Sequence, residues 1–134
     1  MCLGQINPSE PITRVIFYHR HFDATDAKVK FGAFLPPAKS HGSSIPADQR
    51  TTSICRVKGL GEEEIWVKAD RIAGTRPPPR ARADLPARAV TEIGLQIDVG
   101  TGQTRHAEIV GWESESHILE MAGKLALAAT LVLR

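Results

Sequence analysis

The stretch "TEIGLQIDVG", residues 91–100, shows the clearest two-residue alternation in the chain. Apolar side chains occupy every second position and polar ones lie between them, which is typical of a strand with one buried face. A turn at 100–103 and a second strand-like segment at 105–112 follow, so we expect a β-hairpin here. The sequence therefore predicts a sheet that is mostly antiparallel.

Three earlier segments also have the composition of strands, because β-branched and aromatic residues are frequent in them. They are residues 13–22, 28–35 and 53–59, and the first two are close enough to form a hairpin. Together with 91–100 and 105–112, they predict a sheet of about five strands.

Two segments favour helices. Residues 61–74 begin with three glutamates at the positive end of the helix dipole and end at Gly74, although a strand through this segment is an alternative. Residues 114–134 carry apolar side chains at helical spacing after Ser114 or Ser116, which can cap the helix. We expect the C-terminal helix to pack against the sheet, which gives an α+β fold.

The 134 residues suit a single domain over 1–134. Within it, the segment 75–88 contains four prolines and four arginines, and we expect a Pro/Arg-rich connector without regular structure. Residues 1–88 hold 14 Lys/Arg against 9 Asp/Glu, whereas residues 89–134 hold 3 against 6, so the charge is polarised along the chain.

The chain has two cysteines and no C-x-x-C motif, which argues against a disulfide framework or a zinc site built on cysteine. We expect reduced thiols and a cytoplasmic location. The longest apolar run, residues 125–133, is too short to cross a bilayer, so we expect no membrane partner.

A first candidate site lies in "FYHRHFDATD", residues 17–26. On an extended strand His19, His21 and Asp23 share one face and could hold a divalent metal, the cofactor that this pattern suggests. His41 or His106 could supply a further ligand. Such a site would make the protein a small metal-dependent hydrolase.

The HxHxD string resembles a motif of metallo-hydrolases of the β-lactamase type, in which a further histidine follows the aspartate; here that position is Ala24. The HxH part also resembles the first motif of the cupins, which continues with a glutamate and glycines at fixed spacing. The resemblance covers about eight residues, and no functional residue is carried over from it.

A second candidate site lies in the loop 38–52, where a histidine stands beside serines. Serine becomes nucleophilic when a base takes its proton. Ser44 would be the nucleophile and His41 or His106 the base, although the G-x-S-x-G elbow is missing.

The third candidate is the connector itself, in which Arg76, Arg80, Arg82 and Arg88 could follow the phosphates of a nucleic acid or contact a protein partner. No aromatic residue is interleaved with them for base stacking.

Three functions follow from these patterns. The first is a non-enzymatic binding or interaction module, which could be an accessory subunit of a larger assembly with a protein partner. The second is the metal-dependent hydrolase, and the third is an RNA- or DNA-binding accessory protein.

Overall fold

The centre of the molecule is a six-stranded sheet with the order β10-β7-β1-β6-β9-β8, in which each pair of neighbours is antiparallel. The computed structural model describes residues 6–100 and 104–134, so Cys2 and most of the predicted turn at 100–103 lie outside the described residues. The α+β prediction is confirmed, with one strand more than expected in the sheet. The strands are β1 (Pro11–Ile16), β6 (Thr52–Arg56), β7 (Ala81–Pro86), β8 (Gln96–Asp98), β9 (His106–Val110) and β10 (Thr130–Leu133).

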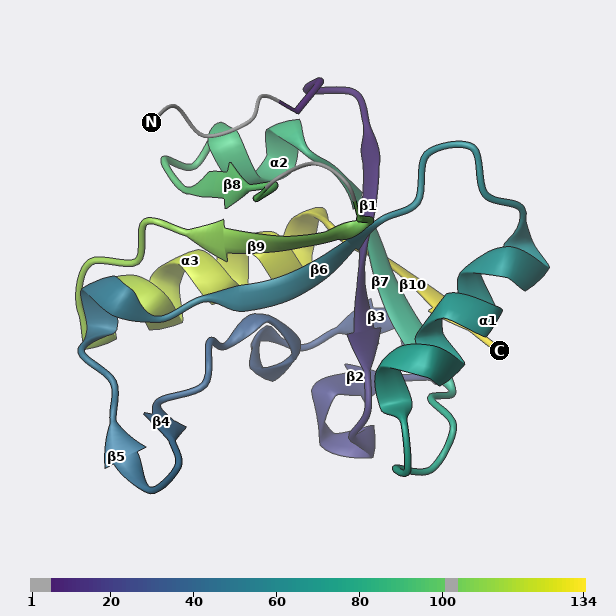
Figure 1. The fold of residues 1–134 in the computed structure, drawn as a ribbon, viewed down its shortest axis with the longest axis horizontal. Helices are drawn as coiled ribbons and strands as arrows, with labels where there is room; N and C mark the ends of the chain where they lie inside the picture. The colour runs from purple at the N-terminus through teal and green to yellow at the C-terminus, as the bar shows by residue number, and fades with distance from the viewer. Residues whose placement is uncertain (1–5, 101–103) are drawn as a thin grey trace.

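Two helices cover the sheet from opposite sides (Figure 1). The C-terminal helix α3 (Glu115–Ala128) lies behind the sheet, and α1 (Glu62–Ala73) packs on the other face, where its Trp66 and Ala69 contact Val15 of β1. A short helix α2 (Arg88–Thr91) connects β7 to β8. The predicted helix at 61–74 is confirmed. Gly74 ends it with a backbone φ of 60°, a value that residues other than glycine rarely adopt.

The smaller elements lie between β1 and β6. Two short hairpins pair β2 (Phe22–Asp23) with β3 (Lys28–Val29) and β4 (Lys39–Ser40) with β5 (Ser43–Ser44). Three 3-10 turns accompany them: η1 (His19–His21), η2 (Phe31–Phe34) and η3 (Ala47–Gln49).

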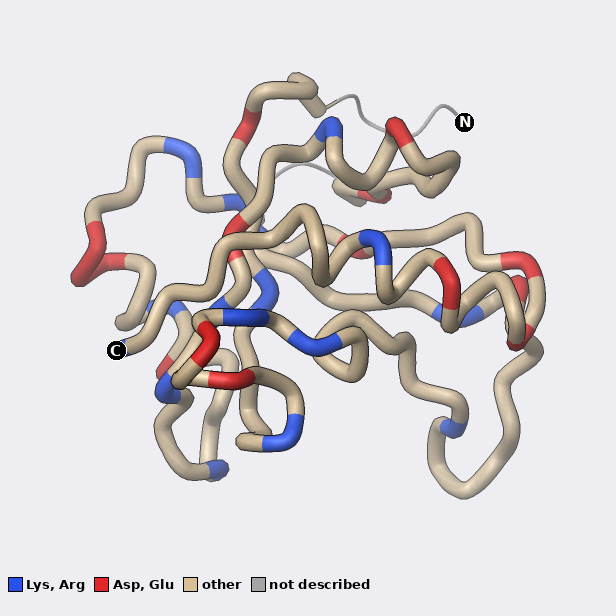
Figure 2. Tube along the Cα trace, turned by 180° about the vertical axis from the view of Figure 1, so that it is seen from behind, with Lys and Arg blue, Asp and Glu red and all other residues tan. Residues whose placement is uncertain are grey.

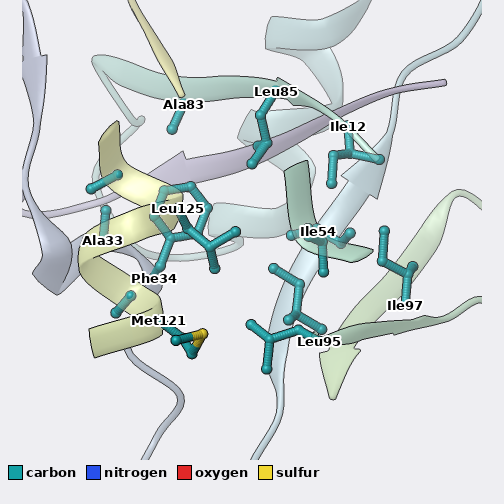
Figure 3. Packing of buried hydrophobic residues seen from close by; sticks show 14 of the residues in the cluster. Ile12, Ala33, Phe34, Ile54, Ala83, Leu85, Leu95, Ile97, Met121 and Leu125 are labelled. Atoms are coloured by element: carbon teal, nitrogen blue, oxygen red, sulfur yellow. The ribbon is translucent and has the colours of Figure 1, made fainter. Parts of the chain in front are cut away.

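The main hydrophobic core lies between the sheet and α3 (Figure 3). Strand residues such as Ile12, Ile54 and Ala83 face Leu125 of the helix and Phe34 of η2. A smaller cluster on the other face joins Val15 of β1 to Trp66 and Ala69 of α1. The alternation at 91–100 is found in the buried side chains of Leu95, Ile97 and Val99, although only Gln96–Asp98 are paired as a strand.

The predicted C-terminal helix begins as expected, because the Ser114 side chain accepts a hydrogen bond from the backbone N–H of His117 at 3.2 Å. The prediction that it continues to residue 134 is wrong. The helix ends at Ala128, and Thr130–Leu133 form β10, which pairs with β7. No helix among the described residues is long and apolar enough to cross a membrane.

The segment 75–88 was expected to be irregular, and for Ala81–Pro86 that prediction is wrong. These residues form β7, which lies between β1 and β10. Ala81, Ala83 and Leu85 face the main core, while Arg82 is only 3% exposed on the opposite face. The small alanine side chains allow close packing, and Pro86 stands at the strand end, where proline is tolerated.

The expected strands 13–22 and 28–35 are both shorter than predicted. β1 ends at Ile16, opposite Ala81 at the start of β7, and the chain then turns through η1. The second segment contributes only Lys28–Val29 before η2 begins. A strand continues only while a neighbouring strand can satisfy its backbone, so β1 stops where its partner begins.

Candidate functional site

A groove forms where the loop after α1 crosses the end of β1. Arg76 Nε and Nη2 donate hydrogen bonds to the carbonyls of Ala73 and Ile72 at 3.2 and 3.1 Å, which fixes the guanidinium against the last turn of the helix. Its Cζ lies 3.9 Å from the centre of the Phe17 ring, a cation–π contact. Through these contacts Arg76 holds the C-terminal end of α1 against Phe17, the residue that follows β1.

The groove has a volume of about 460 Å³. One wall comes from the segment 16–22 and the other from 76–80, which are far apart in the sequence. We call it the aromatic–arginine groove; its lining residues are Ile16, Phe17, Tyr18, His19, Phe22, Arg76, Pro77, Pro78 and Arg80.

The aromatic wall of the groove is accessible. Tyr18 is 49% exposed, and the guanidinium carbon of Arg20 lies 4.6 Å from its ring centre. The His19 and Phe22 rings lie 5.8 Å apart in a tilted arrangement. Arg20 covers one face of the Tyr18 ring, so a flat ligand ring can stack on the Arg20 guanidinium or on the part of the phenol that remains exposed.

Several arginines in and around the groove have no carboxylate partner among the described residues. Among the residues that the structure describes, Arg14, Arg20, Arg76 and Arg80 take part in no ion pair, whereas Arg50, Arg56, Arg82 and Arg134 do. Figure 2 shows Lys and Arg at this end of the molecule, where the 76–80 loop meets the segment 17–30, together with the acidic positions Asp23 and Asp26 of that segment. An anionic ligand would supply the missing partners.

Arg14 lies beneath this surface, where β1 and β6 separate after the pair Thr13–Cys55. Its Nε donates to the carbonyl of Ala33 at 2.9 Å and its Nη1 to that of Ser53 at 2.8 Å. Burial, with a further contribution from Arg76, lowers the pKa of Arg14 from its ordinary value. The guanidinium thus replaces missing ladder contacts and adds positive charge below the groove.

His21 packs inward, close to the backbone of η2. A Cβ added at Gly32 would lie 2.7 Å from His21 Cδ2, so the ring occupies the space that this glycine leaves. Burial, together with the nearby charges of Arg20 and Arg14, lowers the pKa of His21. The neutral ring contacts Tyr18 edge-on, with 5.3 Å between the ring centres.

The proposed metal ligands are arranged differently from the sequence prediction. His19 and His21 lie in the turn η1 rather than on one strand face, and their rings contact Phe22 and Tyr18, respectively. Asp23 Oδ1 accepts hydrogen bonds from the backbone N–H groups of Thr25 and Asp26 at 2.9 and 3.1 Å. Within residues 6–100 and 104–134, no group of three His, Cys, Asp or Glu side chains is placed to hold a metal ion.

The proposed catalytic residues lie in two different parts of the molecule. His41 is at the tip of the β4–β5 hairpin with a φ of 50°, and Ser44 is exposed on β5. His106 begins β9 in the main sheet, where its Nε2 lies 3.6 Å from a carboxylate oxygen of Glu108. In Figure 1 the hairpin projects away from the sheet, so the structure does not bring His106 to Ser44.

The four arginines of 76–88 do not form one surface. Arg76 and Arg80 line the groove, whereas Arg88 follows β7 at its other end, about 20 Å away along a six-residue strand. Arg82 is buried, and its guanidinium pairs with Glu62 at 2.8 Å and Asp84 at 3.0 Å. It anchors α1 to the sheet and is not free for a ligand.

The aromatic partners of Arg76 and Arg80 were missed by sequence reasoning, because they come from another segment. A signal was present: three of the seven aromatic residues of the chain fall within 17–22. In a chain so poor in aromatics, that concentration on one short segment marks it as a possible stacking surface.

Comparison with known proteins adds no relative, since no family model, curated protein or solved structure matches this chain.

Proposed function

We propose that the protein is a non-enzymatic binding module that holds single-stranded nucleic acid in the aromatic–arginine groove. The observation that carries this proposal is the position of Arg76 and Arg80, which lack carboxylate partners among the described residues, beside the exposed ring of Tyr18. Guanidinium groups bind phosphates, and exposed aromatic rings stack on bases.

A single strand fits these features better than a duplex. In a duplex the base faces are already stacked on one another, so an exposed tyrosine could reach them only after unpairing. A single strand leaves the base faces free. Tyr18 on one wall is 49% exposed, so a base can reach it, and Arg80 on the other wall is exposed to a phosphate.

A binding role also agrees with the placement of the other candidates. His41 and Ser44 lie away from His106, and Asp23 accepts backbone hydrogen bonds in a turn. The proposal includes a cytoplasmic location, because a reducing compartment maintains a free thiol such as that of Cys55.

The test is fluorescence anisotropy with a labelled oligothymidylate over a range of salt concentrations. Arg80→Ala should weaken binding and reduce the salt slope by about one, because one phosphate contact is lost. Tyr18→Ala should weaken binding by about tenfold, the contribution of one stacked base. Neither side chain is buried, so both variants should fold.

Arg88→Ala is the matched control, because it removes the same charge from the far end of β7. It should leave the affinity within about twofold of the wild type. The proposal fails if Arg88→Ala and Arg80→Ala weaken binding equally, or if the wild type binds no oligonucleotide at low salt. Equal affinity for a polyglutamate peptide would indicate a protein partner instead.

A further inference from the structure

Two adjoining hollows lead away from the aromatic–arginine groove along α1. They lie between the C-terminal half of this helix and strands β1, β6 and β9, with volumes of about 130 and 270 Å³. Phe17 lines both the groove and the nearer hollow, so the groove and the hollows adjoin at this ring. We call the two hollows the α1 cleft; the residues that both share are Ile54, Cys55, Ile72 and His106.

The α1 cleft is basic along its length. Of the described residues that line the groove and the cleft, none is Asp or Glu. Lys68, Arg71 and Arg105 stand at the far part of the cleft, and the ion pairs found among the described residues include none of them. A carboxylate oxygen of Glu108 lies 3.6 Å from Nε2 of His106, which lines the cleft.

Arg105 is fixed by hydrogen bonds to the backbone, whereas Lys68 and Arg71 are positioned by the helix that carries them. Arg105 Nη1 donates to the backbone carbonyls of Arg56 and Lys58 at 3.2 and 2.9 Å, which fixes its guanidinium at the edge of β6. Lys68 and Arg71 lie on α1 three residues apart and therefore extend toward the same side of the helix. The three charges thus come from two walls of the cleft.

The floor of the cleft is apolar. Val15 and Cys55 are buried there, while Ile72 remains 46% exposed at the edge of the helix. A partly exposed isoleucine beside cationic groups suits the face of a base, which is flat and weakly polar, with its phosphate directed to the charges. The same combination would be poorly suited to a cation.

We propose that a single strand bound in the aromatic–arginine groove continues past Phe17 into the α1 cleft, where Lys68, Arg71 and Arg105 contact its phosphates and Ile72 contacts a base. This inference rests on the proposed function, since it extends the ligand already assigned to the groove. It predicts a second part of the binding site, which only a longer strand can reach.

The experiment compares oligothymidylates of about four and about twelve nucleotides, the range of single-strand site sizes in small domains. The variant is Lys68→Ala/Arg71→Ala, which removes the two α1 charges that line the cleft. The control is Arg88→Ala/Lys124→Ala, which removes the same charge from α2 and α3. Circular dichroism checks that both double variants are folded.

The readout is the ratio of the long-strand affinity to the short-strand affinity, measured by anisotropy at several salt concentrations. A longer strand offers more registers, but this statistical advantage is the same for both proteins and cancels when their ratios are compared. In the α1 variant, the ratio should fall by about tenfold and the salt slope for the long strand by about two. The control variant should retain the wild-type ratio.

The outcomes separate the two proposals. If the wild type binds the short strand and the α1 variant keeps the wild-type ratio, the inference about the cleft is wrong and the groove remains. If the α1 variant weakens both lengths equally, the cleft is not a second part of the site. If the wild type binds neither length, both proposals fail.

Discussion

Gly32 and His21 illustrate how a single atom decides a local structure. The structure leaves no room for a side chain at Gly32, because a Cβ there would lie 2.7 and 3.0 Å from Cδ2 and Nε2 of the His21 ring. The ring cannot move freely, since it also contacts Tyr18. The glycine therefore determines where the aromatic wall of the groove stands.

Replacing Gly32 by alanine should lower the free energy of unfolding by about 1–3 kcal/mol, the usual cost of overpacking. Gly123→Ala is the matched control, because a Cβ there would meet nothing within 4 Å and the residue lies inside α3. This second substitution should stabilise the protein by about 0.5–1 kcal/mol through helix propensity. Urea unfolding of both variants measures the difference, and equal effects would show that the His21 contact does not constrain Gly32.

His21 should also make stability depend on pH. Because its pKa in the folded protein is lowered from the ordinary value of 6.5, the unfolded chain binds more protons than the folded one as the pH falls through 6.5. The free energy of unfolding should therefore decrease between about pH 7.5 and pH 5, above the range in which carboxylates titrate. His21→Gln should reduce this slope in urea titrations; an unchanged slope would assign it to another group.

At the scale of elements, β10 shows how a strand can follow a helix without a loop. Arg134 N–H donates to the carbonyl of Arg80 at 2.9 Å, and hydrogen-bonded pairs alternate along an antiparallel ladder. Val132, opposite Arg82, is therefore the next hydrogen-bonded pair, while the backbone N–H of Leu133 points away from β7. Val132 and Leu133 therefore differ in whether their backbone N–H bonds to β7.

Val132→Pro should lower the free energy of unfolding by about 3 kcal/mol, because it removes a donor from the ladder. Leu133→Pro should cost less than half as much, since the donor that it removes has no partner in β7. Thermal unfolding with calorimetry compares the two variants. If both cost the same, the alternation of hydrogen bonds inferred for β10 is incorrect.

β7 and β10 also show what the sequence could and could not predict. The alternation of Ala81, Ala83 and Leu85 was visible, but the prolines before it and the charged residues between them suggested an irregular segment. Arg82 can be buried there because Glu62 and Asp84 reach it, a tertiary contact that no local pattern reveals. The residues after Ala128 have suitable spacing for a helix, yet pairing with β7 favours a strand.

The same reasoning applies to the groove. The sequence indicated both of its segments, 17–26 and 75–88, each as a separate site with its own chemistry. Their meeting depends on the pair Ile16–Ala81, where β1 ends beside the start of β7. Long-range strand pairing therefore decides the site, and a short sequence window cannot predict it.

At the scale of the whole molecule, the β4–β5 hairpin stands out among the described residues by its exposure to solvent. Each of residues 37–44 is exposed, and the hairpin projects from the sheet in Figure 1. Local opening of such a segment requires little free energy, so proteases reach it first. We expect trypsin under native conditions to cut after Lys39 before any other site, as mass spectrometry of the early fragments would show.

Lys39→Gln is the variant that tests this expectation, because it removes the cleavage site without changing a buried contact. The first fragment should then disappear and the intact chain should persist longer. Early cleavage within α1 or β7 instead would place the least stable region elsewhere.

The position of β1 in the middle of the sheet has a consequence for the order of folding. Thr13 bonds to the backbone of Ala83, 70 residues further along the chain, while its other neighbour is β6. A nascent chain therefore leaves one edge of β1 unpaired until β7 has been synthesised, and the loop that must close between them is long. Refolding should accordingly occur in milliseconds to seconds, as for other topologies with distant strand partners, rather than in microseconds.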